Sequence, residues 1–222
     1  MRPRFQDDSF FPHVVLLINN HTSHVYRLKG SFGEAKIYWD GHHKVYELKS
    51  EVGVMASTLH YCQFVQIFNV GSVSDYAEIK DHHPTYLPYL LKTPEEIHHL
   101  QGDLQNWYWS TCEDCAYISP KEDTPDFKRL VSKKGRNLSL ADLTFNEQVA
   151  KFRVSIEQFF GRVVQKWAVP RNIYRWDHKH FQMDFENFCM LTNKDIKVFI
   201  CNFIFDLKFL YYFCNVKLMY KI

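Results

Sequence analysis

The longest regular pattern in this sequence of 222 residues is an apolar stripe between Thr144 and Trp167. No Pro interrupts the stretch, Gly161 is its one Gly, and Pro170 follows it. Apolar residues recur along it at helical spacing: Val149, Phe152, Ile156, Phe159 or Phe160, Val163 and Trp167. The pattern predicts a long amphipathic helix, which must bury its stripe against another layer of structure.

Short β-branched and apolar segments come before this helix and predict strands. Residues His13–Ile18 have the composition of a buried strand that ends at Asn19-Asn20. Residues 36–55 predict a hairpin, because their Asp-Gly pair favours a tight turn. The apolar runs Tyr61–Val70 and Trp107–Thr111 predict further strands. We therefore expect three consecutive antiparallel strands before any long helix.

Three shorter helices are also expected. Asp75 can cap a short helix that reaches Ile79, and the Pro-containing residues 84–94 should break regular structure after it. Thr93-Pro94-Glu95-Glu96 is a good helix start, and Asp184–Thr192 has the pattern of one more helix. Four tryptophans are expected in the core: Trp107, Trp109, Trp167 and Trp176.

Composition predicts one globular domain with poorly defined ends. Apolar residues make up 46% of the chain and charged residues 23%, which is typical of a folded protein. We expect an N-terminal extension at residues 1–12, a folded domain at residues 13–193 and a divergent tail at residues 194–222, where the composition changes abruptly.

Net charge and cysteine spacing indicate the cellular environment in which the chain is expected. A net charge of +2 gives no global basic field, and six irregularly spaced cysteines indicate a reduced interior. The chain opens without a secretory signal. The apolar run from Val198 to Phe213 carries Asp206 and Lys208 and is shorter than the ~20 residues that a bilayer requires. We therefore expect no membrane association, and a location in the nucleus or the cytoplasm.

Three acids stand in separate short signatures. Asp75 closes the motif Gly71–Asp75, Asp114 opens Asp114–Tyr117, and Glu157 lies on the expected long helix. A fourth acid would be expected after the first strand, where the chain has Asn20. Carboxylates from distant segments can converge to hold two divalent cations for phosphodiester cleavage, since hard oxygen ligands suit Mg²⁺ and Mn²⁺.

Each of these signatures also has a purely structural interpretation. An Asp after a strand is commonly a turn residue or a helix cap, and Glu157 could pair with Arg153 one helical turn away. Cys112 and Cys115 form a single Cys-x-x-Cys, which is a weak indication of a zinc site. The basic residues between Lys128 and Arg136 form either a solvated face or a contact to phosphates.

Taken in order, the motifs resemble the catalytic core of the PIF/Harbinger group of DDE-type transposases, which are DDE superfamily endonucleases. Residues 20–22 stand where that family has Asp-x-Thr, residues 38–49 resemble its hairpin, and residues 71–75 resemble its Gly-Ser-x-x-Asp. Residues 114–117 resemble its Asp-x-Gly-Tyr, with Ala in place of Gly, and residues 153–162 resemble its Arg-x-x-x-Glu-x-x-Phe-Gly-Arg. The resemblance covers most of the chain, from about Val14 to Asn193.

This resemblance implies an α/β fold of the RNase H-like class, in which helices flank a mixed sheet. It implies DNA as substrate and Mg²⁺ or Mn²⁺ as cofactor. Asp114, Glu157 and the position of Asn20 would be catalytic, and these three with Asp75 would hold the metal. Asn20 offers a neutral amide where two dications need a carboxylate, so the second cation should bind poorly.

Two rival functions stay open beside the nuclease. The chain could be a non-catalytic transposase remnant that binds DNA or protein, or a His/Cys metalloprotein unrelated to transposition. The family's N-terminal DNA-binding region has no room before residue 13, so target selection would need a separate DNA-binding protein chain.

Overall fold

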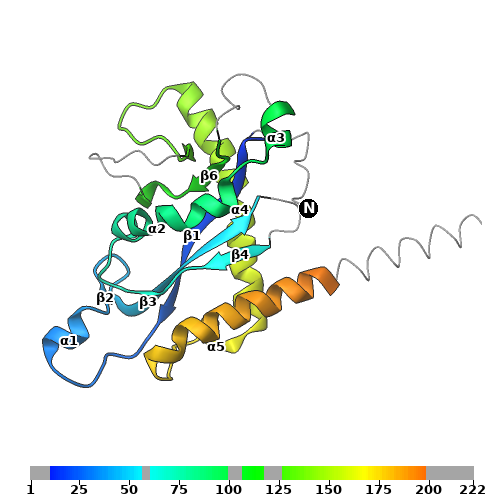
Figure 1. Ribbon diagram of the computed structural model, residues 1–222. Helices are drawn as coiled ribbons and strands as arrows, with labels where there is room; N and C mark the ends of the chain where they lie inside the picture. Colours follow the sequence, from blue (N-terminus) through cyan, green and yellow to red (C-terminus); the bar gives the residue numbers. More distant parts are fainter. Residues whose placement is uncertain (1–10, 57–60, 100–106, 118–126, 199–222) are drawn as a thin grey trace, which may run out of the picture.

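The computed structural model describes residues 11–56, 61–99, 107–117 and 127–198 (Figure 1). Its strands are β1 Val14–His24, β2 Trp39–Asp40, β3 Val45–Met55, β4 Cys62–Val65, β5 Asn69–Val70, β6 Ser110–Glu113 and β7 Arg129–Leu130. Its helices are α1 Phe32–Lys36, α2 Asp75–Leu90, α3 Pro94–His99, α4 Leu140–Lys166 and α5 Ala168–Arg171, followed by helical residues 181–198.

The seven strands form one mixed sheet in the order β2-β3-β1-β6-β7, and β4 and β5 also pair with β3. β1 pairs with β3 antiparallel and with β6 parallel, and β6 pairs with β7 parallel. Helices lie on both sides of this sheet (Figure 1). The expected α/β class is confirmed, and the mixed, helix-flanked sheet is consistent with an RNase H-like fold.

Two apolar cores lie on the two faces of the sheet. One contains Leu17 and Val52 together with Val149 and Phe159 of α4 and Phe185 of the helical residues 181–198. The other is smaller and packs Leu16, Ile18 and Phe64 against Tyr86 and Leu90 of α2. Because successive strand side chains point to opposite faces, β1 supplies both cores.

The long helix predicted from the apolar stripe is α4, and its buried residues are Val149, Ile156, Phe159 and Val163. It begins four residues earlier than the stripe. Ser139 caps it by accepting the Asp142 amide, while the Asp142 carboxylate accepts the Ser139 amide. The predicted hairpin is also present, with Trp39 opposite Tyr46 and Asp40 opposite Val45.

Two local expectations were wrong. The first strand does not end at Asn20 but continues to His24, because β3 pairs with it as far as Glu47. Helix α2 does not end near Ile79, since it continues through Pro84 and Pro88 to Leu90. Burial of Tyr86 and Leu90 in the second core outweighs the poor helix propensity of Pro.

Two of the four tryptophans expected in the core are exposed instead. Trp109 is buried as expected and Trp167 packs against the larger core, but Trp107 is 69% exposed and Trp176 is 55% exposed. The helix predicted at Asp184–Thr192 spans residues 181–198, so it passes the expected boundary at Asn193. Within the described residues no helix is long and apolar enough to cross a membrane. The apolar run from Val198 to Phe213 lies almost wholly outside them.

The stability of the fold should fall in acid because of His21. Its ring stacks on Phe185 with 5.0 Å between centroids and contacts Phe160 at 5.3 Å. Burial lowers the pKa of His21 to about 4, although a hydrogen bond to the Pro170 carbonyl opposes the shift. The unfolded chain therefore binds more protons than the folded chain between pH 6.5 and pH 4, and stability is lost as the pH falls through that window.

We expect His21→Phe to remove about 2 to 3 kcal/mol of this acid-induced loss, measured by urea unfolding at pH 6.5 and pH 4. Phe keeps the aromatic stacking but carries no titrating group. The matched control is His24→Phe at an exposed position of the same strand. Equal pH dependence in the parent and in His21→Phe would contradict the assignment.

Candidate active site

The parallel pairing of β1 and β6 brings two of the predicted site residues to one edge of the sheet. The register places Ile18 opposite Glu113, so Asn20 and Asp114 lie just beyond that pair. Asp114 accepts the Ala116 amide at 2.8 Å in a tight turn. Ala116 has no positive φ, so Ala serves at this position where the related motif has Gly.

Asp75 reaches the same edge because the loop before α2 docks on the hairpin. The Gly71 amide donates to the Glu47 carbonyl at 2.9 Å, and the Ser72 amide donates to the Ile37 carbonyl at 3.0 Å. A Cβ at Gly71 would lie 2.5 Å from the Tyr38 carbonyl oxygen, so only glycine allows this approach. Ser74 then caps α2, and Asp75 is its first residue.

A cavity of about 1050 Å³ lies at this edge, and Asn20, Asp75 and Asp114 all line it. The hairpin closes another side of it with Asp40 and Lys49. Glu157 is not among the lining residues. Its side chain is exposed on α4, and among the described residues that side chain has no hydrogen bond or ion pair. Its role as a metal ligand stays a prediction.

The side chain of Asn20 joins two carboxylates. Its Nδ2 donates to Asp75 Oδ1 at 3.0 Å and to Glu78 Oε2 at 2.8 Å. Both bonds are charge-assisted when the acids are ionised, which makes them stronger than neutral ones. A carboxylate at position 20 could not donate either bond. The neutral amide therefore helps the two acids to lie side by side.

Glu78 is a site residue that motif analysis missed. It lies three residues after Asp75, on the same face of α2, and is 2% exposed. Burial raises the pKa of Glu78 to about 7, and the nearby Glu51 adds to the effect, while the bonds from Asn69 and Asn20 oppose it. Helical spacing after the Gly-Ser-x-x-Asp motif was the signal that could have found it.

Lys49 provides a positive charge inside the cavity. Its Nζ lies 2.9 Å from Asp40 Oδ2 and 3.4 Å from Asp75 Oδ1, and it donates to the Val73 carbonyl at 3.1 Å. Burial alone would lower the pKa of Lys49, but the bond to Asp40 and the charge of Asp75 raise it instead. The ammonium therefore partly neutralises one of the predicted metal ligands.

Asp114 is neutralised in a similar way. The Arg153 guanidinium of α4 lies 2.6 Å from Asp114 Oδ2. Burial would raise the pKa of Asp114, but the Ala116 amide and the Arg153 charge outweigh it and hold the pKa below its usual value. The structure thus places Arg153 on Asp114, and the alternative ion pair between Arg153 and Glu157 is not formed.

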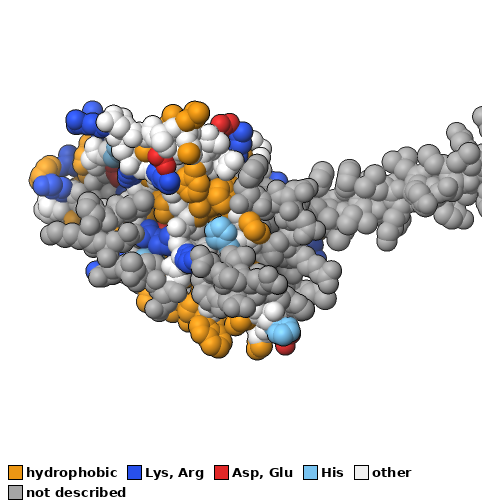
Figure 2. Space-filling view, turned by 90° about the horizontal axis from the view of Figure 1, so that it is seen from above, with side chains coloured by type: hydrophobic (Ala, Val, Ile, Leu, Met, Phe, Trp, Pro, Cys, Tyr) orange, Lys and Arg blue, Asp and Glu red, His pale blue; other side chains and the backbone are white. Residues whose placement is uncertain are grey.

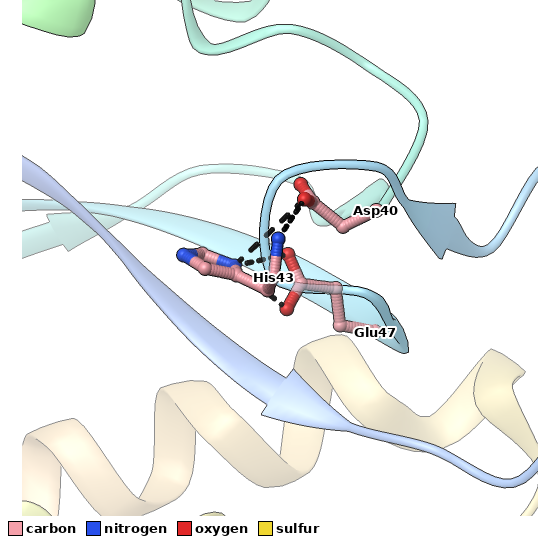
Figure 3. Close-up of side chains that lie close together, drawn as sticks. All are labelled: Asp40, His43 and Glu47. Carbon is pink, nitrogen blue, oxygen red and sulfur yellow. Dashed lines mark hydrogen bonds and ion pairs between the residues drawn. The ribbon is translucent and has the colours of Figure 1, made fainter.

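The hairpin carries a second group of possible cation ligands (Figure 3). Ligand atoms of Asp40, His43 and Glu47 all lie within 4.8 Å of one another. His43 Nδ1 is 3.2 Å from both carboxylate oxygens of Glu47. Asp40 Oδ1 already accepts the His42 and His43 amides, and its Oδ2 binds Lys49. A cation here would therefore compete with Lys49 for Asp40.

Asn20, Asp75 and Glu78 carry oxygen atoms of the kind that hard divalent cations bind, but the Asn20 amide presents its Nδ2 to both carboxylates, so a shared cation requires the amide to rotate. Asn20 Oδ1 and Glu78 Oε1 are buried and have no hydrogen-bond partner within the described part of the chain. Asp75 adds a carboxylate that is 31% exposed. Amide and carboxylate oxygens suit Mg²⁺ and Mn²⁺. Asn20, Asp75 and Glu78 could hold such a cation, whereas a second one at Asp114 would have to displace the Arg153 guanidinium.

The structure also bears on the possible zinc site at Cys112 and Cys115 and on the basic stretch between Lys128 and Arg136. Cys112 is buried in β6, and neither it nor Cys115 belongs to a possible metal-binding group among the described residues. The basic stretch is not simply solvated, because Arg129 binds the buried Glu113 at 2.6 Å and Lys133 binds Asp142. In the face seen in Figure 2, the described Lys and Arg side chains lie at separate places and form no continuous patch.

We expect Lys49→Met to destabilise the fold by about 3 kcal/mol, because it leaves the buried Asp40 carboxylate without its cation. Urea unfolding at pH 7 measures the loss. Lys36→Met is the matched control, since Lys36 lines the same cavity but is exposed. Similar effects of the two substitutions would show that the Lys49 ion pair contributes little.

Comparison with known proteins agrees with this geometry. The DDE superfamily endonuclease family matches residues 27–193, which include Asp75, Asp114 and Glu157. The match begins seven residues after Asn20, so the role expected for that position stays a prediction. No curated protein and no solved structure matches the chain. With three quarters of its length matched by the family, the chain belongs to the DDE superfamily endonucleases.

Proposed function

We propose that this chain is the catalytic domain of a PIF/Harbinger-type transposase or a nuclease derived from one, with activity reduced by Asn20. Its substrate would be DNA, and its reaction the hydrolysis or transfer of phosphodiesters. The observation that supports the proposal is that Asn20, Asp75 and Asp114 line one cavity, where the Asn20 amide donates to Asp75 and to the neighbouring Glu78.

The residues have distinct parts in this proposal. Asn20, Asp75 and Glu78 would hold one Mg²⁺ or Mn²⁺, and Asp114, with help from Glu157, would hold a second only after the Arg153 guanidinium is displaced. A bound divalent cation would neutralise charge on the phosphodiester and promote loss of a proton from the attacking water or hydroxyl. Arg153 holds Asp114 in place and keeps it ionised. Target selection would rest on a separate DNA-binding chain.

A second function is favoured by the two internal cations. Lys49 and Arg153 contact Asp75 and Asp114, so the fold can tolerate its clustered acids without any metal. This supports a non-catalytic descendant that keeps the fold and binds DNA or protein. The two functions differ in one measurable respect, which is whether restoring a carboxylate at position 20 restores cleavage.

We expect Asn20→Asp to nick supercoiled plasmid in Mn²⁺ at least about 10-fold faster than the parent, because it returns a charged ligand to the metal site. Asn19→Asp adds the same charge one residue away and serves as control. Adding Asp114→Asn or Glu157→Ala to Asn20→Asp should abolish the gain.

Metal binding gives an independent measurement. Without metal, Asn20→Asp should melt at a lower temperature than the parent, since a third carboxylate joins Asp75 and Glu78 and the two bonds from the Asn20 amide are lost. With Mn²⁺ its melting temperature should rise more than that of the parent. If Asn20→Asp gains neither cleavage nor Mn²⁺-dependent stability, the nuclease proposal is wrong and the non-catalytic function stands.

A further inference from the structure

A second cavity of about 500 Å³ lies where the end of β1 meets the segment before the helical residues 181–198. Val25 forms a bridge with Tyr174, and the Tyr174 amide donates to the His24 carbonyl at 2.7 Å, which holds the two segments together. We call this cavity the aromatic–basic cleft. Its lining residues are Tyr26, Arg27, Leu28, Lys29, Tyr38, Tyr174, Arg175, Trp176, Asp177 and His178.

The aromatic–basic cleft adjoins the candidate active site. Ile37 and Trp39 line the larger cavity, whereas Tyr38 between them lines the cleft. One short segment therefore separates the two hollows.

Aromatic rings form both the floor and the walls of the cleft. Tyr174 is buried, and its ring lies 5.4 Å from that of Trp176 and 5.1 Å from that of Phe181. The Tyr174 hydroxyl donates to Asp184 at 2.7 Å, which fixes the floor. Above it Tyr26 is 54% exposed and Trp176 is 55% exposed. Two large rings left open to solvent on a supported floor offer flat faces for stacking.

The charge at the cleft is positive. Arg27, Lys29 and Arg175 line it, and within the described residues none of the three has a carboxylate partner. Arg175 lies over the Tyr26 ring at 5.8 Å. The acid of the cleft, Asp177, binds Lys179 at 2.9 Å. The cations are therefore available to an anionic ligand.

We propose that the aromatic–basic cleft binds unpaired nucleotides of a single DNA strand, with bases stacked on Tyr26 and Trp176 and phosphates held by Arg27, Lys29 and Arg175. Exposed aromatic faces among cations are how proteins hold single strands, because every base has a face that can stack. In a duplex the base faces are covered by neighbouring base pairs, so a duplex cannot use these rings. The proposal adds a strand-binding site to the proposed function, but the binding itself needs no metal.

The test is fluorescence anisotropy of a labelled oligothymidylate with the full chain in EDTA, where nuclease activity cannot contribute. Trp176→Ala should weaken binding roughly 5- to 100-fold through loss of one stack. Trp176→Tyr should retain most of the affinity, because Tyr also stacks. Trp107→Ala removes an even more exposed Trp outside the cleft and should leave binding unchanged.

Two further measurements sharpen the result. Lys29→Ala should weaken binding and lower the slope of log Kd against log salt by about one, as expected for one lost phosphate contact. A duplex of the same length should bind more weakly and show no sensitivity to Trp176→Ala. The proposal is overturned if Trp176→Ala binds like the parent, if Trp107→Ala weakens binding equally, or if oligouridylate binds more tightly than oligothymidylate.

Discussion

The parallel pairing of β1 with β6 is the constraint on which the rest of the candidate site depends. It aligns the ends of two central strands, so that Asn20 and Asp114, far apart in the sequence, lie at one edge of the sheet. Antiparallel pairing of β1 with β3 then brings Lys49 to the same place. Any function of this chain that uses its acids must work at this edge, since open α/β sheets present their ligand sites beyond the carboxyl ends of parallel strands.

Three buried glutamates on the α2 face of the sheet need compensation of their charge. Glu51, Glu78 and Glu113 are each at most 2% exposed, and each is compensated differently. Glu113 has the Arg129 guanidinium, Glu51 accepts from Tyr86 and lies 3.1 Å from His82, and Glu78 has the Asn20 amide. Burial of ionised groups is costly unless each finds such a partner. Burial raises the pKa of Glu78 to about 7, and burial also raises the pKa of Glu113 despite the Arg129 charge.

The sequence was sufficient for elements whose pattern is local and strong. The stripe of α4 and the hairpin turn at Asp40 depend on neighbours in the chain, whereas the cap of α2 was expected at Asp75 and lies one residue earlier, at Ser74. Helix α2 through Pro84 was not predictable, because Tyr86 and Leu90 stabilise it only when β1 and β4 are already in place. Lys49 and Glu78 carry no motif of their own, and only tertiary packing shows that they contact Asn20 or Asp75. Trp176 was expected in the core because it is a large aromatic residue, but its side chain is exposed to solvent.

Asn20 links these observations to the evolution of activity. An Asp to Asn change costs little volume, yet it converts an acceptor that repels Asp75 and Glu78 into a donor that binds both. On the proposed function, the same change would weaken a metal centre and relieve the charge repulsion that the metal would otherwise neutralise. Asn20, Lys49 and Arg153 then stabilise the clustered acids in place of a cation. On this proposal, one position would affect stability and catalysis in opposite directions.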